Sequence, residues 1–294
     1  MTVLCVGEMM VEVAARPDGT ARLGFGGDTF NTAVYLSRLG QPTGYLTAFG
    51  DDPYSAMARA ALAEEGVSDA GCPTATGATL GLYAIRTDGR GERTFTYWRQ
   101  NAPARGLFGQ WFSDGVEARL MQAGLVYLSG ITLWLYDAPA LDRLFALLAK
   151  ARGAGAKVAF DGNYRPRLWG ADRGATRVVY DRMLRLTDIC LATADDEQAL
   201  WDDASPSQTV ARLQRAGVAE VVVKSGPDGA LLGTGEWVAT TPDPSPVDTT
   251  AAGDSFNAAY LAARLSGASA AQAAAAGNAL AAKVIRHPGA LMPR

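Results

Sequence analysis

The chain has 294 residues, of which 48% are hydrophobic and 19% charged, and its formal net charge is −3. These values are typical of a globular protein, and without any basic run they argue against nucleic acid or an anionic membrane as a partner. The three cysteines, Cys5, Cys72 and Cys190, lie far apart, which predicts a reducing, cytoplasmic location without disulfides or a zinc site. The single histidine, His287, excludes Ser-His-Asp triads, cysteine–histidine pairs and multi-histidine metal sites.

Short runs rich in Val, Leu and Ile alternate along the chain with stretches of helical pattern. This alternation predicts an α/β fold with a mostly parallel sheet covered on both faces. Residues 3–7 read as a first strand and not as a signal peptide, because no basic segment precedes them. The further expected strands are 44–49, 125–129, 157–161, 188–191 and 220–224. The expected helices include 29–39, 54–65 and 137–152, with Gly40, Gly66 and Gly153 as their C-terminal stops.

Residues 79–99 interrupt the alternation and read as two strands joined by a turn at 87–92 that contains an Asp-Gly pair. Side chains alternate along a strand, so Phe95, Tyr97 and Arg99 share one face of the second strand. Tyr83 lies on the first strand. A Tyr-Tyr-Arg surface on a small antiparallel sheet predicts a lid over a polar ligand. The alternative is a hairpin at the edge of a sheet that carries these side chains without binding a ligand.

The segment 247–257 follows a proline-rich loop and opens an alanine-rich helix that ends near Leu265. Small residues here, Ala252 and Gly253 among them, expose backbone amides at a helix N-terminus, where the helix dipole favours an anion. Asp254 then has two possible roles, either as an ordinary acid at a helix start or as a base beside a bound phosphoryl group. Composition alone does not decide between them.

Two common nucleotide-binding motifs are absent from the sequence. There is no G-x-x-x-x-G-K-[ST] pattern, which excludes a P-loop enzyme. The first strand is followed by Gly7-Glu8-Met9-Met10 and not by G-x-G-x-x-G, which disfavours a dinucleotide oxidoreductase.

Two segments resemble the signatures of the ribokinase-like (PfkB) carbohydrate kinases. Residues 248–254 resemble D-T-x-G-A-G-D, with Ala251 in place of a glycine, and residues 26–33 resemble G-G-x-x-x-N-x-A. The resemblance covers nearly the whole chain. It implies a ribokinase-like three-layer sandwich with a mostly parallel central sheet plus a small antiparallel β lid. We expect a single kinase domain, 1–294, whose lid comes from about 9–26 and 77–100.

Residues 93–99 and 160–169 are similar to the 2-keto-3-deoxygluconate kinase branch of this family. Such a substrate is a sugar acid, and arginine matches a carboxylate with two parallel donors. Arg99 and Arg165 are the candidates, with Tyr83 and Tyr97 supplying hydroxyls and cover. The resemblance implies the substrate-binding residues Gly27, Asn31, Tyr83, Tyr97, Arg99 and Arg165. Glu12 reads either as a group for distal hydroxyls or as a partner for a lid cation.

The resemblance also implies transfer of the ATP γ-phosphoryl group to the terminal hydroxyl of the sugar. Asp254 accepts the hydroxyl proton, and the backbone amides of Ala252, Gly253 and Asp254 hold the developing charge. Mg²⁺ neutralises the phosphates, and Glu197 resembles the acid of the N-x-x-E magnesium motif, although Ala194 stands where the asparagine belongs. The implied nucleotide-binding residues are Asn163, Arg165, Lys224, Ser225, Gly226, Gly229, Gly253 and Asn278.

Three alternatives remain open at this point. A fructokinase or another neutral-sugar kinase of the same fold does not need Arg99. A non-catalytic sugar-acid sensor does not need Asp254, and a dinucleotide oxidoreductase would bind nicotinamide. The short lid has an exposed edge, which predicts a homodimer or a higher homo-oligomer built on it.

Overall fold

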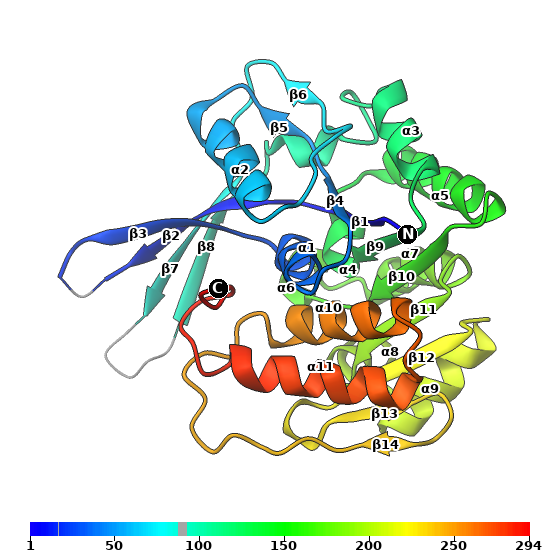
Figure 1. Ribbon diagram of the computed structural model, residues 1–294. Helices are drawn as coiled ribbons and strands as arrows, with labels where there is room; N and C mark the ends of the chain where they lie inside the picture. Colours follow the sequence, from blue (N-terminus) through cyan, green and yellow to red (C-terminus); the bar gives the residue numbers. More distant parts are fainter. Residues whose placement is uncertain (17, 88–92) are drawn as a thin grey trace.

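The computed structural model describes residues 1–16, 18–87 and 93–294. Its centre is an eight-stranded sheet in the order β14-β13-β12-β11-β10-β9-β1-β4 (Figure 1). The six strands from β12 to β4 are parallel, and β13 and β14 join the edge in antiparallel pairs. The bounds are β1 Val3–Val6, β4 Thr43–Leu46, β9 Leu125–Ser129, β10 Lys157–Asp161, β11 Ile189–Thr193, β12 Glu220–Lys224, β13 Ala230–Leu232 and β14 Trp237–Val238.

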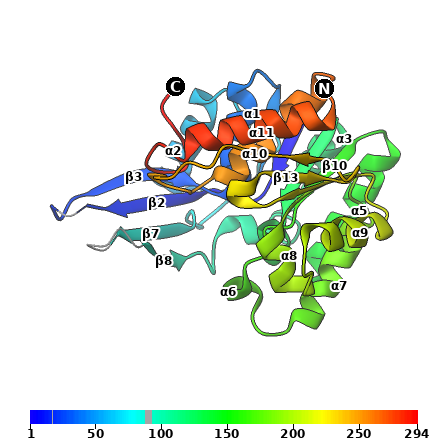
Figure 2. The ribbon, with the colours of Figure 1, turned by 90° about the horizontal axis from the view of Figure 1, so that it is seen from below.

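The central sheet is apolar on both faces, so each face packs against its own layer of helices. In β1, Leu4 and Val6 belong to one hydrophobic core, whereas Val3 and Cys5 belong to the other. This alternation follows from the two-residue period of a strand. Figure 2 shows the result as three layers, with the sheet between two groups of helices. The α/β class predicted from the sequence is therefore confirmed.

The helices divide between the two faces. One face carries α1 Asp28–Arg38, α2 Pro53–Glu64, α10 Ala252–Leu265 and α11 Ala270–Val284. The opposite face carries α3 Asp114–Met121, α5 Ala138–Gly153, α7 Arg173–Leu184, α8 Ala194–Trp201 and α9 Pro206–Arg215. Shorter elements complete the described chain, namely α4 Gly130–Trp134, α6 Pro166–Trp169, η1 Pro103–Gly106, η2 Gly226–Asp228, β5 Phe49–Gly50 and β6 Thr74–Ala75.

A second sheet of four strands, which we call the small sheet, projects from the body (Figure 1). Its order is β3-β2-β7-β8, in which the outer pairs are antiparallel and the central pair, β2 and β7, is parallel. In the β7–β8 pair, Tyr83 lies opposite Tyr97. The strand bounds are β2 Met10–Ala15, β3 Ala21–Gly26, β7 Leu82–Thr87 and β8 Arg93–Trp98.

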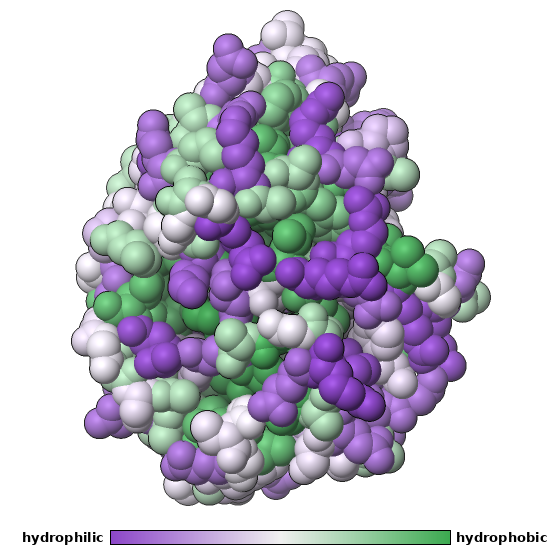
Figure 3. Space-filling model, turned by 90° about the vertical axis from the view of Figure 1, so that its right-hand side faces the viewer, coloured by the Kyte–Doolittle hydropathy of each residue, from purple (hydrophilic) through white to green (hydrophobic). Residues whose placement is uncertain are grey.

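Large apolar side chains are exposed on both the body and the small sheet. On the face of the molecule seen in Figure 3, polar and apolar residues are interspersed. The small sheet exposes Leu23 on one edge strand, β3, and Phe95, Tyr97 and Trp98 on the other, β8. No helix in the described part of the chain is long and apolar enough to cross a membrane.

Some predicted boundaries are wrong. The strand predicted at 44–49 divides into β4 and β5, because Phe49 leaves the central sheet and pairs with Thr74. Gly153 does not stop its helix but is the last residue of α5, and the left-handed turn comes at Gly155, with φ of 100°. The Asp-Gly pair of the predicted turn at 87–92 lies outside the described residues.

Candidate active site

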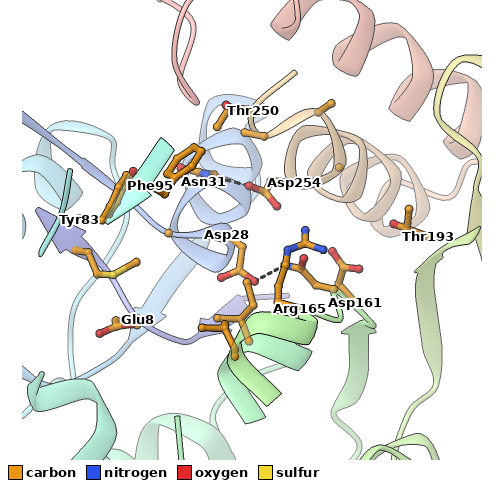
Figure 4. Close-up of a pocket in the computed structure, with 18 of the residues that line it drawn as sticks. Glu8, Asp28, Asn31, Tyr83, Phe95, Asp161, Arg165, Thr193, Thr250 and Asp254 are labelled. Atoms are coloured by element: carbon orange, nitrogen blue, oxygen red, sulfur yellow. Dashed lines mark hydrogen bonds between the residues drawn. The ribbon is translucent and has the colours of Figure 1, made fainter. Parts of the chain in front are cut away.

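A cavity of about 640 Å³ lies between the small sheet and the start of α10. We call it the main cavity. Three parallel strands, β10, β11 and β12, end at its wall with Asp161, Thr193 and Lys224, and Glu8 follows the end of β1. The carboxyl ends of parallel strands are the usual place for a ligand in a sheet of this kind. In Figure 4, Glu8 lies on one side of Asp254, whereas Asp161 and Thr193 lie on the other.

The N-terminus of α10 points at the cavity because Ala251, Ala252 and Gly253 all line it. Ala251 has φ of 61°, in the left-handed region that glycine adopts most readily. This conformation explains why the family signature has glycine at that position. It also turns the chain so that the first amides of α10, which have no partner within the helix, face the cavity.

Asp254 lies in the first turn of α10, half-buried beside two other acids of the cavity. Its Oδ2 accepts a hydrogen bond of 2.9 Å from Nδ2 of Asn31 (Figure 4). Burial raises the pKa of Asp254 to about 8, and the negative charges of Asp28 and Asp161 act in the same direction, against the Asn31 hydrogen bond. A carboxyl with such a pKa can take up a proton near neutral pH, as a general base must.

Behind the start of α10 lies a buried polar network. Nζ of Lys224 is 2.9 Å from Oδ1 of Asn257 and 3.5 Å from both carboxylate oxygens of Asp161. Nδ2 of Asn257 donates to Asp161 at 2.7 Å and to the hydroxyl of Tyr127 at 3.0 Å. A Cβ atom on Gly253 would lie 3.6 Å from Nζ of Lys224. One fixed positive charge therefore stands beside the exposed amides, where an anion would bind.

The small sheet closes the opposite side with Tyr83, Tyr97 and Arg99, which all line the cavity. The Tyr83 and Tyr97 rings pack together at 5.9 Å between centroids. The hydroxyl of Tyr83 donates to Oε2 of Glu12 at 2.6 Å, and Arg22 donates to Oε1 of the same residue at 2.8 Å. Glu12 thus has the arrangement predicted as the second alternative, a partner for a cation of the small sheet.

Arg99 is almost fully buried and forms an ion pair with Glu8, whose side chain is only 2% exposed. Burial raises the pKa of Glu8, whereas the charges of Arg99 and Arg105 act against this rise. The sequence analysis did not single out Glu8. Its position directly after β1, at the carboxyl edge of a parallel sheet, is the signal that could have identified it.

Arg165 and Asn163 come from the loop after β10. Nη1 of Arg165 pairs with Asp196 at 3.0 Å, and its pKa is raised because the charges of Asp196, Asp161 and Asp28 outweigh its burial. Nδ2 of Asn163 donates to Oδ2 of Asp28 at 2.7 Å. Asn163 has φ of 36°, so this loop holds a non-glycine residue in the left-handed region next to the cavity.

The main cavity brings together most of the residues predicted for the site. They are Gly27, Asn31, Tyr83, Tyr97, Arg99, Asn163, Arg165, Lys224, Ala252, Gly253 and Asp254. The lining also includes Phe95, which was expected to share a strand face with Tyr97 and Arg99. Further lining residues were not indicated by the sequence, namely Glu8, Met10, Asp28, Ile131, Asp161, Arg167, Leu168, Thr193, Thr249 and Thr250.

Five predicted residues do not line this cavity. Ser225, Gly226 and Gly229 belong to the turn after β12, and Asn278 on α11 donates to the carbonyl oxygen of Val238 at 3.1 Å. A Cβ atom on Gly229 would lie 2.2 Å from that same oxygen. The turn after β12 and Asn278 therefore both lie against the backbone at Val238.

Glu197, the fifth of these residues, is buried behind the cavity. Its carboxylate forms an ion pair with Arg212, and a Cβ atom on Gly162 would lie 2.5 Å from its Oε1. Burial raises the pKa of Glu197 to about 7, with Arg212 acting against this rise. Among the described residues, no group of three or more His, Cys, Asp or Glu side chains is arranged to hold a metal ion.

Comparison with known proteins identifies relatives along the whole chain. Residues 2–293 match the pfkB family of carbohydrate kinases. The 2-dehydro-3-deoxygluconokinase of Escherichia coli K12 is 42% identical, over 98% of this chain and 96% of that protein. The enzyme of the same name from Dickeya dadantii is also 42% identical, over 98% and 96%. Four fructokinases match at 26 to 32% identity over 81 to 88% of this chain.

The fold also has solved relatives. The crystal structure of an Escherichia coli protein described as ribokinase II, in complex with ATP and Mg²⁺, superimposes with a TM-score of 0.85. It is 26% identical, and the match covers 98% of this chain and 94% of that one. The ribokinase-like architecture expected from the sequence is therefore confirmed, and the oxidoreductase alternative is wrong. The chain belongs to the pfkB family of carbohydrate kinases.

Proposed function

We propose that this chain catalyses the ATP-dependent phosphorylation of 2-keto-3-deoxygluconate at its terminal hydroxyl, giving 2-keto-3-deoxy-6-phosphogluconate. One observation carries the proposal. A half-buried acid at a helix N-terminus, Asp254, shares a cavity with the guanidinium groups of Arg99 and Arg165. The acid suits transfer to a hydroxyl, and the arginines suit a substrate that is itself an acid. The 42% identity to enzymes named for this activity supports the same substrate.

In the proposed reaction Asp254 removes the proton from the attacking hydroxyl as the γ-phosphoryl group is transferred. The backbone amides of Ala252, Gly253 and Asp254 hold the negative charge that develops on the phosphoryl oxygens, although that of Ala252 also donates to the carbonyl oxygen of Thr249 at 3.2 Å. Removing one such preorganised donor typically costs about 2.7–4 kcal/mol. Asn31 orients Asp254 through its 2.9 Å hydrogen bond. The carboxylate of the substrate then lies toward Arg99, under the small sheet.

ATP would bind on the other side of Asp254. Lys224, Asn163 and Arg165 line the cavity there and would contact the phosphates. The turn with Ser225, Gly226 and Gly229 would hold the ribose and phosphates, and Asn278 would lie by the adenine.

Mg²⁺ fits the phosphate side only in part. Asp161 lines the cavity and could hold the ion through water, as magnesium often requires. Glu197 is engaged by Arg212, so it could act on the ion only at a distance. When bound, the ion would neutralise the phosphate charge.

A neutral-sugar kinase is the second candidate, and one observation favours it. Arg99 is already paired with Glu8, so the two side chains together carry no net charge. Taken alone, a neutral pair gives no electrostatic preference for a sugar acid over a sugar.

The test is an ADP-release assay with ATP and Mg²⁺ over 2-keto-3-deoxygluconate, its galacto epimer, fructose, ribose and adenosine. We expect activity confined to the keto-deoxy acids. In Arg99→Ala, KM for the acid rises by about 10- to 100-fold, because a charged hydrogen bond is lost. Activity on fructose or ribose that is insensitive to Arg99 would overturn the substrate and leave the base in place.

We also propose a homo-oligomer formed through the small sheet, in which the exposed apolar side chains Leu23 and Trp98 are covered. Light scattering at micromolar concentration checks this, and a monomer contradicts it.

The small sheet would serve as the lid of one kinase domain. The free thiols of Cys5, Cys72 and Cys190 fit a cytoplasmic location.

A further inference from the structure

Two arginines beneath the small sheet lie against one tryptophan ring. The guanidinium carbon of Arg99 is 4.9 Å from the centroid of the Trp134 ring, and that of Arg105 is 4.7 Å from the same centroid. Arg99 also forms the ion pair with Glu8. Two guanidinium groups, one carboxylate and one aromatic ring therefore form a single cluster, which we call the arginine cluster. Its Glu8 and Arg99 line the main cavity.

The arginine cluster is built into the fold, and several of its polar atoms, Oε1 of Glu8 among them, have no hydrogen-bond partner within the described part of the chain. The side chains of Arg99 and Glu8 are only 5% and 2% exposed. Among the described residues, Nη1 of Arg105 and Nε of Arg99 are buried without any hydrogen-bond partner. A Cβ atom on Gly81 would lie 2.9 Å from Oε1 of Glu8, so the absence of a side chain at Gly81 leaves room for that carboxylate.

The charges of the arginine cluster do not balance. Both guanidinium groups are permanently protonated, whereas Glu8 carries at most one negative charge. At least one positive charge is therefore left over within the cluster, where Arg105 is half-buried and the Glu8–Arg99 pair is almost fully buried. Leaving a buried charge uncompensated is costly, and one additional carboxylate entering the cavity would offset it.

We propose that Arg105 is a positioning residue for the acid group of the substrate, acting through Trp134 and Arg99. It supplies the second positive charge, so that Arg99 can bind the carboxylate of a sugar acid while remaining paired with Glu8. This inference rests on the proposed function and deepens it. It also answers the argument for a neutral sugar, because the charge of the whole cluster, and not of the Glu8–Arg99 pair alone, faces the ligand.

Arg143 provides a matched control for a purely structural role. Its guanidinium carbon is 4.8 Å from the centroid of the Phe112 ring, so it makes the same kind of stacking contact. Nη1 of Arg143, however, donates to the carbonyl oxygen of Phe108, and Arg143 does not belong to the arginine cluster. Loss of stacking alone should therefore look the same in Arg143 and Arg105 variants.

The experiment measures kcat and KM for 2-keto-3-deoxygluconate in the wild type, Arg105→Gln, Arg105→Lys and Arg143→Gln. We expect KM to rise about tenfold in Arg105→Gln, because a charge a few ångströms from the substrate carboxylate is lost at low dielectric constant. In that variant kcat stays within about twofold. Arg105→Lys keeps the charge and stays near the wild type, as does Arg143→Gln. An unchanged KM in Arg105→Gln, or an equal loss in Arg105→Lys, would overturn the inference.

A double-mutant cycle with Glu8→Gln tests the charge balance itself. Removing the negative charge of Glu8 compensates for the loss of Arg105, so the KM penalty of Arg105→Gln should be several-fold smaller in the Glu8→Gln background. An equal or larger penalty there contradicts the proposal.

Calorimetry separates this inference from the proposed function. If the wild type does not phosphorylate 2-keto-3-deoxygluconate, the function fails, but gluconate and its neutral alcohol glucitol can still be titrated into the wild type and Arg105→Gln. Preference for the acid in the wild type, lost in Arg105→Gln, supports the arginine cluster as a carboxylate site. Equal affinities of the wild type for the two compounds, or binding of neither, overturn it.

Discussion

Asp254, which is half-buried, and Glu8, which is buried, are two acids that line one cavity, but their neighbours differ. Asp254 lies close to other acids, and its one side-chain hydrogen-bond donor in the described structure is the neutral Asn31. Glu8 is paired with Arg99 and lies near a second guanidinium, Arg105. Burial raises the pKa of both carboxyls; the charge of Lys224 acts against this rise at Asp254, but only Glu8 is in direct contact with a cation.

This difference in neighbours suits the two acids to different roles. An acid that lies among other acids gains from taking up a proton, which suits a base in catalysis. A buried acid paired with a cation stays in place and keeps the cation oriented, which suits a binding site. In the proposed function, the end of the cavity near α10 would therefore serve proton transfer and the end near the small sheet would serve recognition.

The largest effect should come from Asp254→Asn. The variant keeps the shape of the side chain and cannot accept the proton, so kcat should fall by about 10²- to 10⁴-fold with little change in substrate affinity. Steady-state kinetics and calorimetry measure the two quantities separately. Glu8→Gln should lose at least about tenfold less in kcat. Equal losses in the two variants would remove the distinction between the two acids.

The pH dependence of kcat/KM tests the same difference between Asp254 and Glu8. Asp254 acts as a base only when deprotonated, so kcat/KM should rise with pH up to its pKa of about 8. Asp28→Asn removes a neighbouring negative charge and still lets Asn163 donate its hydrogen bond. The pKa of Asp254 should then fall, and the acid limb should move to lower pH by about one unit. An unmoved limb, or one moved to higher pH, contradicts this account.

Gly81→Ala perturbs the other acid. The new Cβ atom would lie 2.9 Å from Oε1 of Glu8 and 3.2 Å from Cβ of Ala102, so Glu8 must shift away from Arg99. We expect KM for the sugar acid to rise about threefold with little change in kcat, a modest response to overpacking. Gly153→Ala, where a Cβ atom meets nothing within 4 Å, is the matched control. An effect on kcat alone would place Glu8 on the catalytic side.

The sequence allowed one end of the cavity to be predicted better than the other. Asp254 lies in a contiguous segment whose small residues and helix start are visible in the sequence, and the structure places it in the cavity. The Glu8–Arg99 pair joins residues about 90 positions apart, and no local pattern indicates it. Its partner Arg105 depends in addition on the packing of Trp134, which only the folded chain determines.

Short sequence motifs also did not determine where every predicted side chain lies in the fold. Glu197 was expected by resemblance at the metal, but the folded chain pairs it with Arg212, a residue on a different helix. The parallel sheet was predictable because its strands are continuous apolar runs, and the alternation of such runs with helices is a signal within the chain. The individual side-chain contacts at the edge of the sheet could not be predicted, since each of them joins residues from different elements.

The last effect is one on stability, and it follows from the raised pKa of Asp254. In the unfolded chain an aspartate titrates near pH 3.9, whereas folding raises the pKa of Asp254 to about 8. Between these values the folded state binds a proton that the unfolded state does not, so Asp254 lowers the free energy of unfolding progressively as pH rises. In Asp254→Asn this side chain does not titrate, so its contribution to the pH dependence of the free energy of unfolding is absent. The melting temperature of the variant should exceed that of the wild type by an amount that grows between pH 5 and pH 8.5, about 2–4 °C for each kcal/mol in a chain of this size. A difference in melting temperature that stays constant over this range would mean that Asp254 is held ionised, like an acid with a counter-ion, and the contrast with Glu8 would be lost.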